Sequence, residues 1–172
     1  MGLSWNEPEY TALGQDISTR GRRMDEQLAL LRRLWTEPHV EFHGRFHDFD
    51  RIGLNRTVPP IPIWIGSTAD PRALRRAARF ADGWIPMGRP ADEALAQLRA
   101  GLVEEGRDPS TFGLTLGLTL DGGAAEWIEG ARQHEQLGAT HIGLAAPAGL
   151  DSATAQQRII EAVGVLREAF GE

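Results

Sequence analysis

Short apolar runs recur from residue 61 onward, each followed by a turn of small or polar residues and then by a segment with helical spacing. The runs are IPIWI (61–65), GWIPM (83–87), GLTLGLTL (113–120) and THIGLA (140–145). Their centres lie roughly 22 to 31 residues apart, the spacing of βα units with parallel strands. Because continuous apolar strands are covered on both faces, the repeat predicts an α/β fold with a parallel sheet.

Helical signals fill the intervals between these runs. Asp70 is a predicted N-cap followed by Pro71 in the first turn, Gly138 is a predicted C′ residue, and the last helix is expected to open near Ser152. The apolar positions of the successive helices are Leu74, Ala77, Ala78 and Ala81; Leu95, Leu98 and Leu102; Ile128, Ala131 and Leu137; and Ile159, Val163, Leu166 and Phe170.

Residues 1–60 have a different character. Met24, Leu28, Leu31 and Trp35 recur at helical spacing along RGRRMDEQLALLRRLW, which predicts an amphipathic helix. The segment VEFHGRFHDFD follows and places phenylalanines on either side of a His-Gly-Arg turn, which favours a small hairpin. Since no low-complexity linker interrupts the chain, we expect one domain over 1–172, with a head (1–60) and four βα units (61–172).

Composition narrows the classes of function. The chain has 18 basic and 24 acidic side chains and a net charge of −6, and its arginines are scattered beside acidic residues, so nucleic acid is an unfavoured partner. No segment approaches the ~18 consecutive apolar residues that cross a bilayer, and the first residues lack the features of a signal peptide. We therefore expect a cytoplasmic protein. The chain has no cysteine, which excludes thiol chemistry and thiolate metal sites.

The turn GSTADP follows the first apolar run and precedes a helix. Its residues Gly66, Ser67 and Thr68 are small, so backbone N–H groups there can approach a phosphate or a flat ring, and the hydroxyls add donors. Parallel α/β folds carry their ligands at such carboxyl-end turns. Any βα turn needs small residues and an N-cap, however, so a purely structural role is an open alternative.

The next unit repeats the arrangement in GWIPMGRP. Met87 and Gly88 stand at the equivalent strand end, and two adjacent turns of this kind can form one wall of a pocket. Trp84 and Met87 can equally be core residues, and Arg89 a solvated charge at a helix start.

Candidate catalytic residues are missing from the pattern. His39, His43 and His47 are spaced by four, but they fall in the predicted hairpin, where this spacing does not bring imidazoles onto one face, so we expect no metal site. No nucleophile triad, P-loop or dinucleotide fingerprint is present, and the catalytic residues stay unassigned. Hydride transfer from a bound cofactor needs positioning and a dry pocket more than a strong base, so the pattern modestly favours redox chemistry.

Three segments together resemble the luciferase-like monooxygenase family: RGRRMDEQLALLRRLW, FHGRFHDFD and PPIPIWIGSTADPRALRRAARFADGWIPM. Their order and spacing follow the family, and the likeness is greatest to bacterial members that use the deazaflavin coenzyme F420, with FMN-dependent members as relatives. The resemblance implies an F420- or flavin-dependent oxidoreductase or monooxygenase acting on a small molecule.

The same resemblance assigns parts to the segments. The four βα units become units five to eight of a (β/α)8 TIM barrel, preceded by a helix and a hairpin insertion, and GLSWNEPE becomes the end of strand four with its loop. Cofactor contacts are then implied for Gly66, Ser67, Thr68, Met87 and Gly88, and for Trp5 and Asn6 in the strand-four loop. Ser67 stands where the family has its usual second glycine.

The resemblance also implies an incomplete barrel, because an eightfold barrel needs about 250 residues and this chain has 172. Four strands and a helix would leave an apolar inner face and two sheet edges exposed. We expect closure by a second copy in a homodimer, with a partner chain supplying units one to four, or an open sheet covered by the head, as alternatives.

Other interpretations stay open at this point. The chain can be a truncated, non-catalytic member that binds flavin or a partner, or a fragment of a longer enzyme in which Met1 is an internal start. A doubly wound nucleotide-binding domain is a weaker alternative, which would require a switched strand order.

Overall fold

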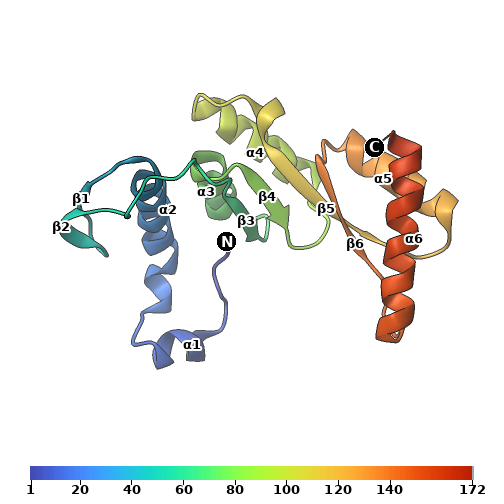
Figure 1. Ribbon diagram of the computed structural model, residues 1–172, viewed down its shortest axis with the longest axis horizontal. Helices are drawn as coiled ribbons and strands as arrows, with labels where there is room; N and C mark the ends of the chain where they lie inside the picture. The colour runs from blue at the N-terminus through green and yellow to red at the C-terminus, as the bar shows by residue number, and fades with distance from the viewer. Residues whose placement is uncertain (172) are drawn as a thin grey trace.

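The computed structural model describes residues 1–171. Helices and strands alternate along most of this length, and the molecule is elongated, with the head at one end and the last two helices at the other (Figure 1). The elements are α1 (Glu7–Ala12), the 3₁₀ turn η1 (Ile17–Thr19), α2 (Arg20–Thr36), β1 (Val40–His43), β2 (Asp48–Ile52), β3 (Trp64–Ser67), α3 (Pro71–Phe80), β4 (Gly83–Pro86), α4 (Asp92–Glu104), the 3₁₀ turn η2 (Pro109–Thr111), β5 (Gly113–Thr119), α5 (Ala124–Gln136), β6 (His141–Ala145) and α6 (Ser152–Phe170).

The main sheet has four parallel strands in the order β3-β4-β5-β6. This confirms the α/β fold with a parallel sheet. Each strand neighbours the next one in the sequence, so the order never reverses, and the doubly wound alternative is wrong because it needs a switch point. The sheet does not close on itself within residues 1–171.

The beginning of the chain extends this sheet beyond β3. The amino group of Met1 donates to the carbonyl of Trp64, and the N–H of Gly66 donates to the carbonyl of Met1 at 2.7 Å. These two bonds form a parallel bridge between Met1 and Ile65. The free edge of β3 therefore accepts a parallel neighbour.

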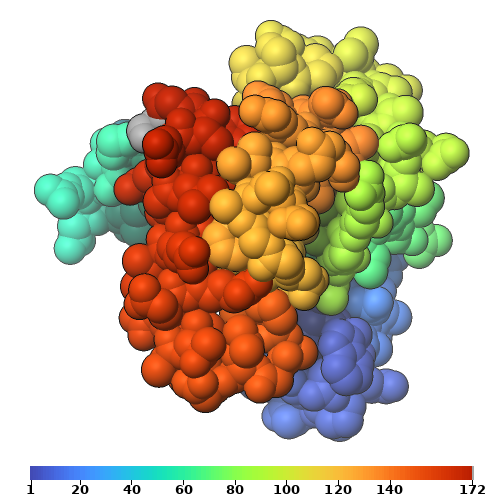
Figure 2. All heavy atoms as spheres, turned by 90° about the vertical axis from the view of Figure 1, so that its right-hand side faces the viewer, coloured from blue at the N-terminus to red at the C-terminus, as the bar shows by residue number. Residues whose placement is uncertain are grey.

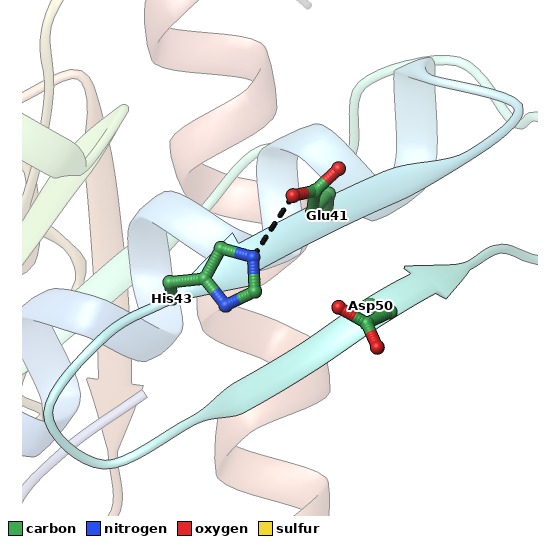
Figure 3. A group of neighbouring side chains, drawn as sticks. All are labelled: Glu41, His43 and Asp50. Carbon is green, nitrogen blue, oxygen red and sulfur yellow. Dashed lines mark hydrogen bonds and ion pairs between the residues drawn. The ribbon is translucent and has the colours of Figure 1, made fainter.

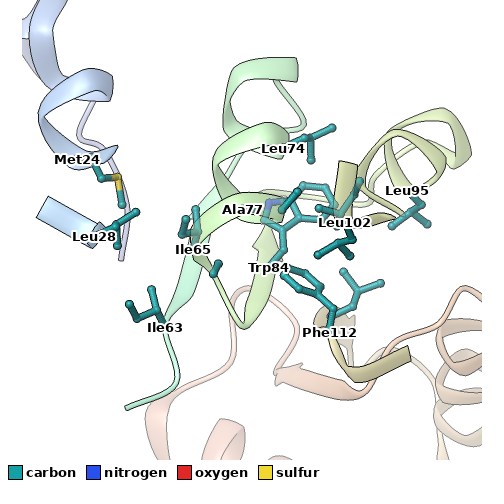
Figure 4. Packing of buried hydrophobic residues seen from close by; sticks show 14 of the residues in the cluster. Met24, Leu28, Ile63, Ile65, Leu74, Ala77, Trp84, Leu95, Leu102 and Phe112 are labelled. Atoms are coloured by element: carbon teal, nitrogen blue, oxygen red, sulfur yellow. The ribbon is translucent and has the colours of Figure 1, made fainter. Parts of the chain in front are cut away.

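A large hydrophobic core lies between β3–β5 and the helices α2, α3 and α4 (Figure 4). Trp84 of β4 is fully buried at its centre, with Leu74 of α3 and Leu102 of α4 packed around it. Met24 and Leu28 bring α2 onto the same core. The predicted helical faces are thus largely correct, except that Leu30 of α2 is buried in place of Leu31.

A second, smaller core lies between β5, α5 and α6. It contains Leu118, Leu120, Trp127, Ala131 and Ala162. Trp127 is buried where the sequence pattern favours Ile128, and α6 buries only Ala162. Two of the four predicted apolar positions of α6, Ile159 and Leu166, pack partly against this core. Val163 and Phe170 are 36% and 39% exposed, and together with Ile160, which is 58% exposed, they form the uncovered stripe of α6.

Small and hydroxyl residues line the face of the sheet that points away from the helices. Along β5 this face carries Gly113, Thr115, Gly117 and Thr119, because leucines occupy the alternating, helix-covered positions. On β5 the expectation of a bare apolar inner face is therefore wrong, because its residues there are glycine and threonine, whereas Ile85 of β4 is apolar and 42% exposed on the same face.

The large side chain of Trp64 crosses this face at the end where the strands begin. The indole of Trp64 lies on two glycines of the neighbouring strands: a Cβ at Gly83 would be 2.4 Å from Trp64 Cε3, and one at Gly113 would be 2.3 Å from Trp64 Cη2. The ring of His141 on β6 meets the same indole edge-on, at 4.9 Å between centroids. Only glycine leaves room for this packing.

The first strand of the sheet begins three residues later than the sequence predicts. Pro60 and Pro62 have no N–H to donate to a ladder, and Ile61 is exposed. The N–H of Ile63 donates to the carboxylate of Asp82 at 2.7 Å. Regular pairing starts at Trp64 for this reason.

The hairpin β1–β2 packs against α2, as the resemblance implies for an insertion, and projects from the body of the molecule (Figure 2). The carboxylate of Glu26 on α2 accepts hydrogen bonds from the backbone N–H groups of Arg45, Phe46 and His47 in the hairpin turn.

The short helix α1 was not predicted. Among residues 1–171, no helix is long and apolar enough to cross a membrane.

Candidate functional site

A groove of about 1210 Å³ opens beside the carboxyl ends of β3 and β4, between the N-terminal part of α2 and the exposed face of α3. Five of the seven cofactor contacts expected from the sequence line it: Trp5, Gly66, Ser67, Thr68 and Met87. They come from the first loop and from the two strand ends. Asn6 and Gly88 are not among its lining residues.

Ser67 ties the two strand-end turns together. Its hydroxyl oxygen accepts a hydrogen bond from the buried indole N–H of Trp84 at 3.0 Å, and its carbonyl accepts the N–H of Met87 at 2.9 Å. A glycine at this position would leave the indole N–H of Trp84 buried without a partner. The serine is therefore part of the framework of the site.

Free donors remain just beyond Ser67. Within residues 1–171, the backbone N–H groups of Thr68 and Ala69 make no hydrogen bond, and they lie in the turn between β3 and α3. At Gly66, an added Cβ would meet nothing closer than 3.9 Å. The turn can thus offer N–H groups to an incoming ligand.

The N-terminus of α3 is already capped by the protein. The carboxylate of Asp70 accepts hydrogen bonds from the N–H groups of Arg72 at 2.9 Å and of Ala73 at 3.3 Å. An anion at this end of the helix would compete with Asp70. The prediction of Asp70 as N-cap is confirmed, and it removes the helix dipole as the main attraction for a ligand.

Four of the expected contacts differ in how they relate to the groove: Trp5 and Met87 line it, whereas Asn6 and Gly88 do not. Trp5 is 84% exposed and Met87 71% exposed, so both present apolar surface to solvent. Gly88 has a positive φ of 85°, a conformation that favours glycine. Asn6 is bound locally, because its side-chain amide donates to Glu9 at 2.8 Å. Hydrogen bonds from Asn6 and Ser4 lower the pKa of the Glu9 carboxyl.

Arginines give the groove a positive lining that the sequence analysis missed. Arg76 is paired with Asp25, and the side chain of Arg20 donates to the carbonyl of Ile17 at 2.8 Å. The signal was available in PRALRRAARF, where arginines occupy the helix face opposite the buried one. The charged groups along the groove are Arg20, Arg22, Arg72, Arg75, Arg76, Arg79, Asp25, Asp70, Glu104 and Glu105.

No histidine, tyrosine or lysine lines the part of the groove that the structure describes. Two of its four carboxylates already have partners, since Asp25 pairs with Arg76 and Asp70 caps α3. This groove can hold and orient a ligand, and Glu104 and Glu105 are its carboxylates without a partner among the described residues. The catalytic residues stay unassigned.

The three spaced histidines do not converge in the structure. His47 Nδ1 lies 2.7 Å from the carboxylate of Glu26, whereas His43 lies between Glu41 and Asp48 on the exposed side of the hairpin. A different group, Glu41, His43 and Asp50, brings its ligand atoms within 4.8 Å of one another. The sequence analysis missed this group because it compared histidines only with histidines.

Comparison with known proteins identifies the family. The profile of the luciferase-like monooxygenase family matches residues 1–172, and the chain belongs to this family. An uncharacterised protein of Mycobacterium tuberculosis is 37% identical over 142 residues, which cover 80% of this chain and 46% of the relative. The F420-dependent hydroxymycolic acid dehydrogenase of M. tuberculosis is 34% identical over 116 residues, which cover 65% of this chain and 32% of that protein.

Solved structures agree at the level of the fold. An F420-dependent secondary alcohol dehydrogenase, solved with an F420-acetone adduct, superimposes with a TM-score of 0.73 at 15% identity, over 92% of this chain and 66% of the other. The chain spans less than half the length of the curated relatives described above.

Proposed function

We propose that this chain binds the deazaflavin coenzyme F420 at the groove beside β3 and β4, as part of an oxidoreductase that transfers a hydride to or from a small organic substrate. Family membership supports the oxidoreductase class. The choice of F420 is supported by relatives named for it, including an F420-dependent glucose-6-phosphate dehydrogenase of Nakamurella multipartita, 34% identical over 113 residues. FMN is the alternative cofactor.

The observation that carries the proposal is the meeting of three separate segments at one groove. The first loop brings Trp5, the end of β3 brings the turn at Gly66 to Thr68, and the end of β4 brings Met87. Ligands of parallel α/β folds bind at these carboxyl ends.

Each segment has a role in this proposal. The free N–H groups of Thr68 and Ala69 bind polar atoms of the coenzyme, and Gly66 lets the ring lie close to the backbone. Trp5 and Met87 cover an apolar part of the ring and exclude water. The arginines of the groove favour an anionic tail. When bound, F420 supplies the carbon that accepts or donates the hydride, and the chain orients it.

We further propose that β3 to β6 are units five to eight of an eightfold barrel, and that a second copy of the chain closes it. Support comes from the parallel bridge of Met1 on one edge, the absence of a neighbour on the outer edge of β6 within residues 1–171, and the uncovered stripe of α6. The alternative is that a separate partner chain supplies the other units and closes the barrel.

Titration of the purified chain with F420 and with FMN, followed by fluorescence quenching, tests the cofactor. Gly66→Val should weaken F420 binding by about tenfold or more, because the new side chain occupies open space at the strand end where backbone approach is required. Gly164→Val is the matched control, since Gly164 lies on α6 with no atom within 4 Å of an added Cβ. No saturable binding of either cofactor, or equal affinity in Gly66→Val, would refute the proposal.

A non-catalytic cofactor-binding member is the second candidate. The lack of a histidine or tyrosine among the described lining residues favours it. Binding of F420 without its reduction by any of a panel of small alcohols would support this candidate. Light scattering in the same samples would separate a dimer from a monomer and so test the closure.

A further inference from the structure

The exposed side of the hairpin gathers four ionisable side chains. Glu41 and His43 alternate along β1, and Asp48 and Asp50 alternate along β2, so all four point to the same side. His43 is directly opposite Asp48 in the register, and the register shifts between Val40 and Phe42, next to Glu41. Figure 3 shows Glu41 and His43 on one strand and Asp50 on the other.

This group lacks a compensating basic side chain. Among residues 1–171, the only ion pairs of Glu41 and Asp48 are with His43, and Asp50 has none. Arg33 reaches only the backbone carbonyl of Glu41, at 3.1 Å, while its guanidinium pairs with Glu37. Like charges that face each other across two strands destabilise a hairpin. A cation would remove this repulsion.

The imidazole of His43 is oriented as metal-binding histidines are. Asp48 lies 2.7 Å from Nδ1, which favours the proton on that nitrogen and leaves the lone pair of Nε2 on the side of Glu41 and Asp50. Nε2 is now 2.9 Å from the Glu41 carboxylate.

We propose that this side of the hairpin binds one divalent transition-metal ion, with His43 Nε2 and the carboxylates of Glu41 and Asp50 as ligands. Their ligand atoms lie within 4.8 Å of one another, and all three side chains are exposed, so small rotations bring them to the ~2.0–2.2 Å bonds of Zn²⁺. Water fills the remaining positions. The imidazole favours Zn²⁺, Ni²⁺ or Cu²⁺ over Ca²⁺ and Mg²⁺, which prefer oxygen ligands alone.

Such an ion would join β1 to β2 at the side opposite α2. Glu26 of α2 already holds the turn of the hairpin through three backbone N–H groups. The metal would therefore stiffen a hairpin that the rest of the fold holds only from one side. This role is independent of the coenzyme groove.

Competition with a chromophoric zinc chelator tests the site on the metal-free chain of 172 residues at neutral pH. We expect one equivalent of Zn²⁺ to bind with micromolar affinity, and His43→Gln and Asp50→Asn each to weaken it at least about tenfold. Asp48→Asn should weaken it less, because Asp48 only orients the imidazole. His39→Gln is the matched control, since His39 is exposed beside the hairpin and outside the group, and its affinity should not change.

Two results would overturn the assignment. One is the absence of binding at micromolar Zn²⁺, and the other is binding that survives unchanged in His43→Gln, which would place the ion elsewhere. Circular dichroism of each variant verifies that a lost affinity does not reflect unfolding. Because the test uses the metal alone, its outcome does not depend on whether the chain binds F420.

Discussion

The two hydrophobic cores differ in how completely they are enclosed. The core around Trp84 is covered by α2, α3 and α4, and its largest side chains are fully buried. The core around Trp127 is covered by α5 and by one face of α6, while the rest of α6 exposes Ile160 and Phe170. The comparison shows that helices enclose the first core more completely than the second.

The strand β5 belongs to both cores. Leu116 is buried in the first and Leu118 in the second. Its pairing with β4 is limited to two residue pairs, Gly83 with Gly113 and Trp84 with Leu114, whereas it pairs with β6 over five. The two cores are therefore joined mainly by one strand.

The largest expected effect on the free energy of unfolding comes from removing the tryptophan at the centre of the first core. Trp84→Ala should lower the free energy of unfolding by about 3–5 kcal/mol, because it leaves a cavity that enclosing helices cannot fill. Trp127→Ala should cost less, because α6 can shift into the space. Urea unfolding of both variants measures the difference. An equal or larger loss in Trp127→Ala would contradict the proposed difference between the cores.

A smaller effect is expected at Asp82, which connects α2 to the first strand. Its carboxylate accepts hydrogen bonds from Arg32 at 2.9 Å and from the N–H of Ile63 at 2.7 Å. Asp82→Ala should lower stability by about 1–2 kcal/mol, because the Ile63 donor loses its partner. Glu161→Ala, an exposed carboxylate of α6, is the control and should be nearly neutral in the same urea experiment.

A pH-dependent effect is expected at Glu26. Burial raises the pKa of its carboxyl, but hydrogen bonds from the His47 ring and from three backbone N–H groups outweigh this and hold the pKa below the usual 4.5. The contribution of a group with a depressed pKa is complete above its unfolded value and is lost as pH falls through the folded value. Glu26→Gln should thus be less stable than the wild type at pH 7, and the gap should close below pH about 4.5.

Thermal unfolding between pH 3 and pH 7 measures this gap. A gap that stays constant over the whole range would show that the negative charge of Glu26 does not hold the hairpin. Glu161→Gln, on the exposed side of α6, supplies a carboxylate without this environment for comparison.

The smallest expected effect on the free energy of unfolding of the monomer comes from a substitution in the uncovered stripe of α6. Ile160→Ser should change the stability of an isolated chain by no more than about 0.5 kcal/mol, because Ile160 is 58% exposed. If a second copy covers α6, the same substitution should shift the oligomer to monomer in light scattering. A dimer that survives Ile160→Ser unchanged would place its interface away from this residue.

The sequence predicted the parts of the fold that depend on local patterns. The βα repeat, the Asp70 cap, the left-handed Gly138 and the hairpin all follow from residue spacing or from single residues with restricted backbone geometry. The predicted start of the first strand was wrong because the apolar residues before Trp64 alternate with Pro60 and Pro62. These prolines have no N–H to donate, so regular pairing begins only after them.

The candidate site was harder to predict, because its contacts join distant segments. The strand ends were found from their small residues, but the bond between Trp84 and Ser67 and the meeting of Glu41 with Asp50 depend on which side chains face each other. Whether Ile128 or Trp127 is buried depends on the rotation of α5 against β5, which periodicity alone does not fix.

The indole of Trp64 resting on Gly83 and Gly113 makes three positions on three strands mutually dependent. While Trp64 is present, a larger residue at either glycine would clash with the indole and destabilise the fold. Once Trp64 has been replaced by a small residue, the same substitution would be tolerated. Relatives that replace this tryptophan should therefore be the ones in which larger residues occur at both glycine sites, and the order in which such changes accumulate is constrained by a single aromatic ring.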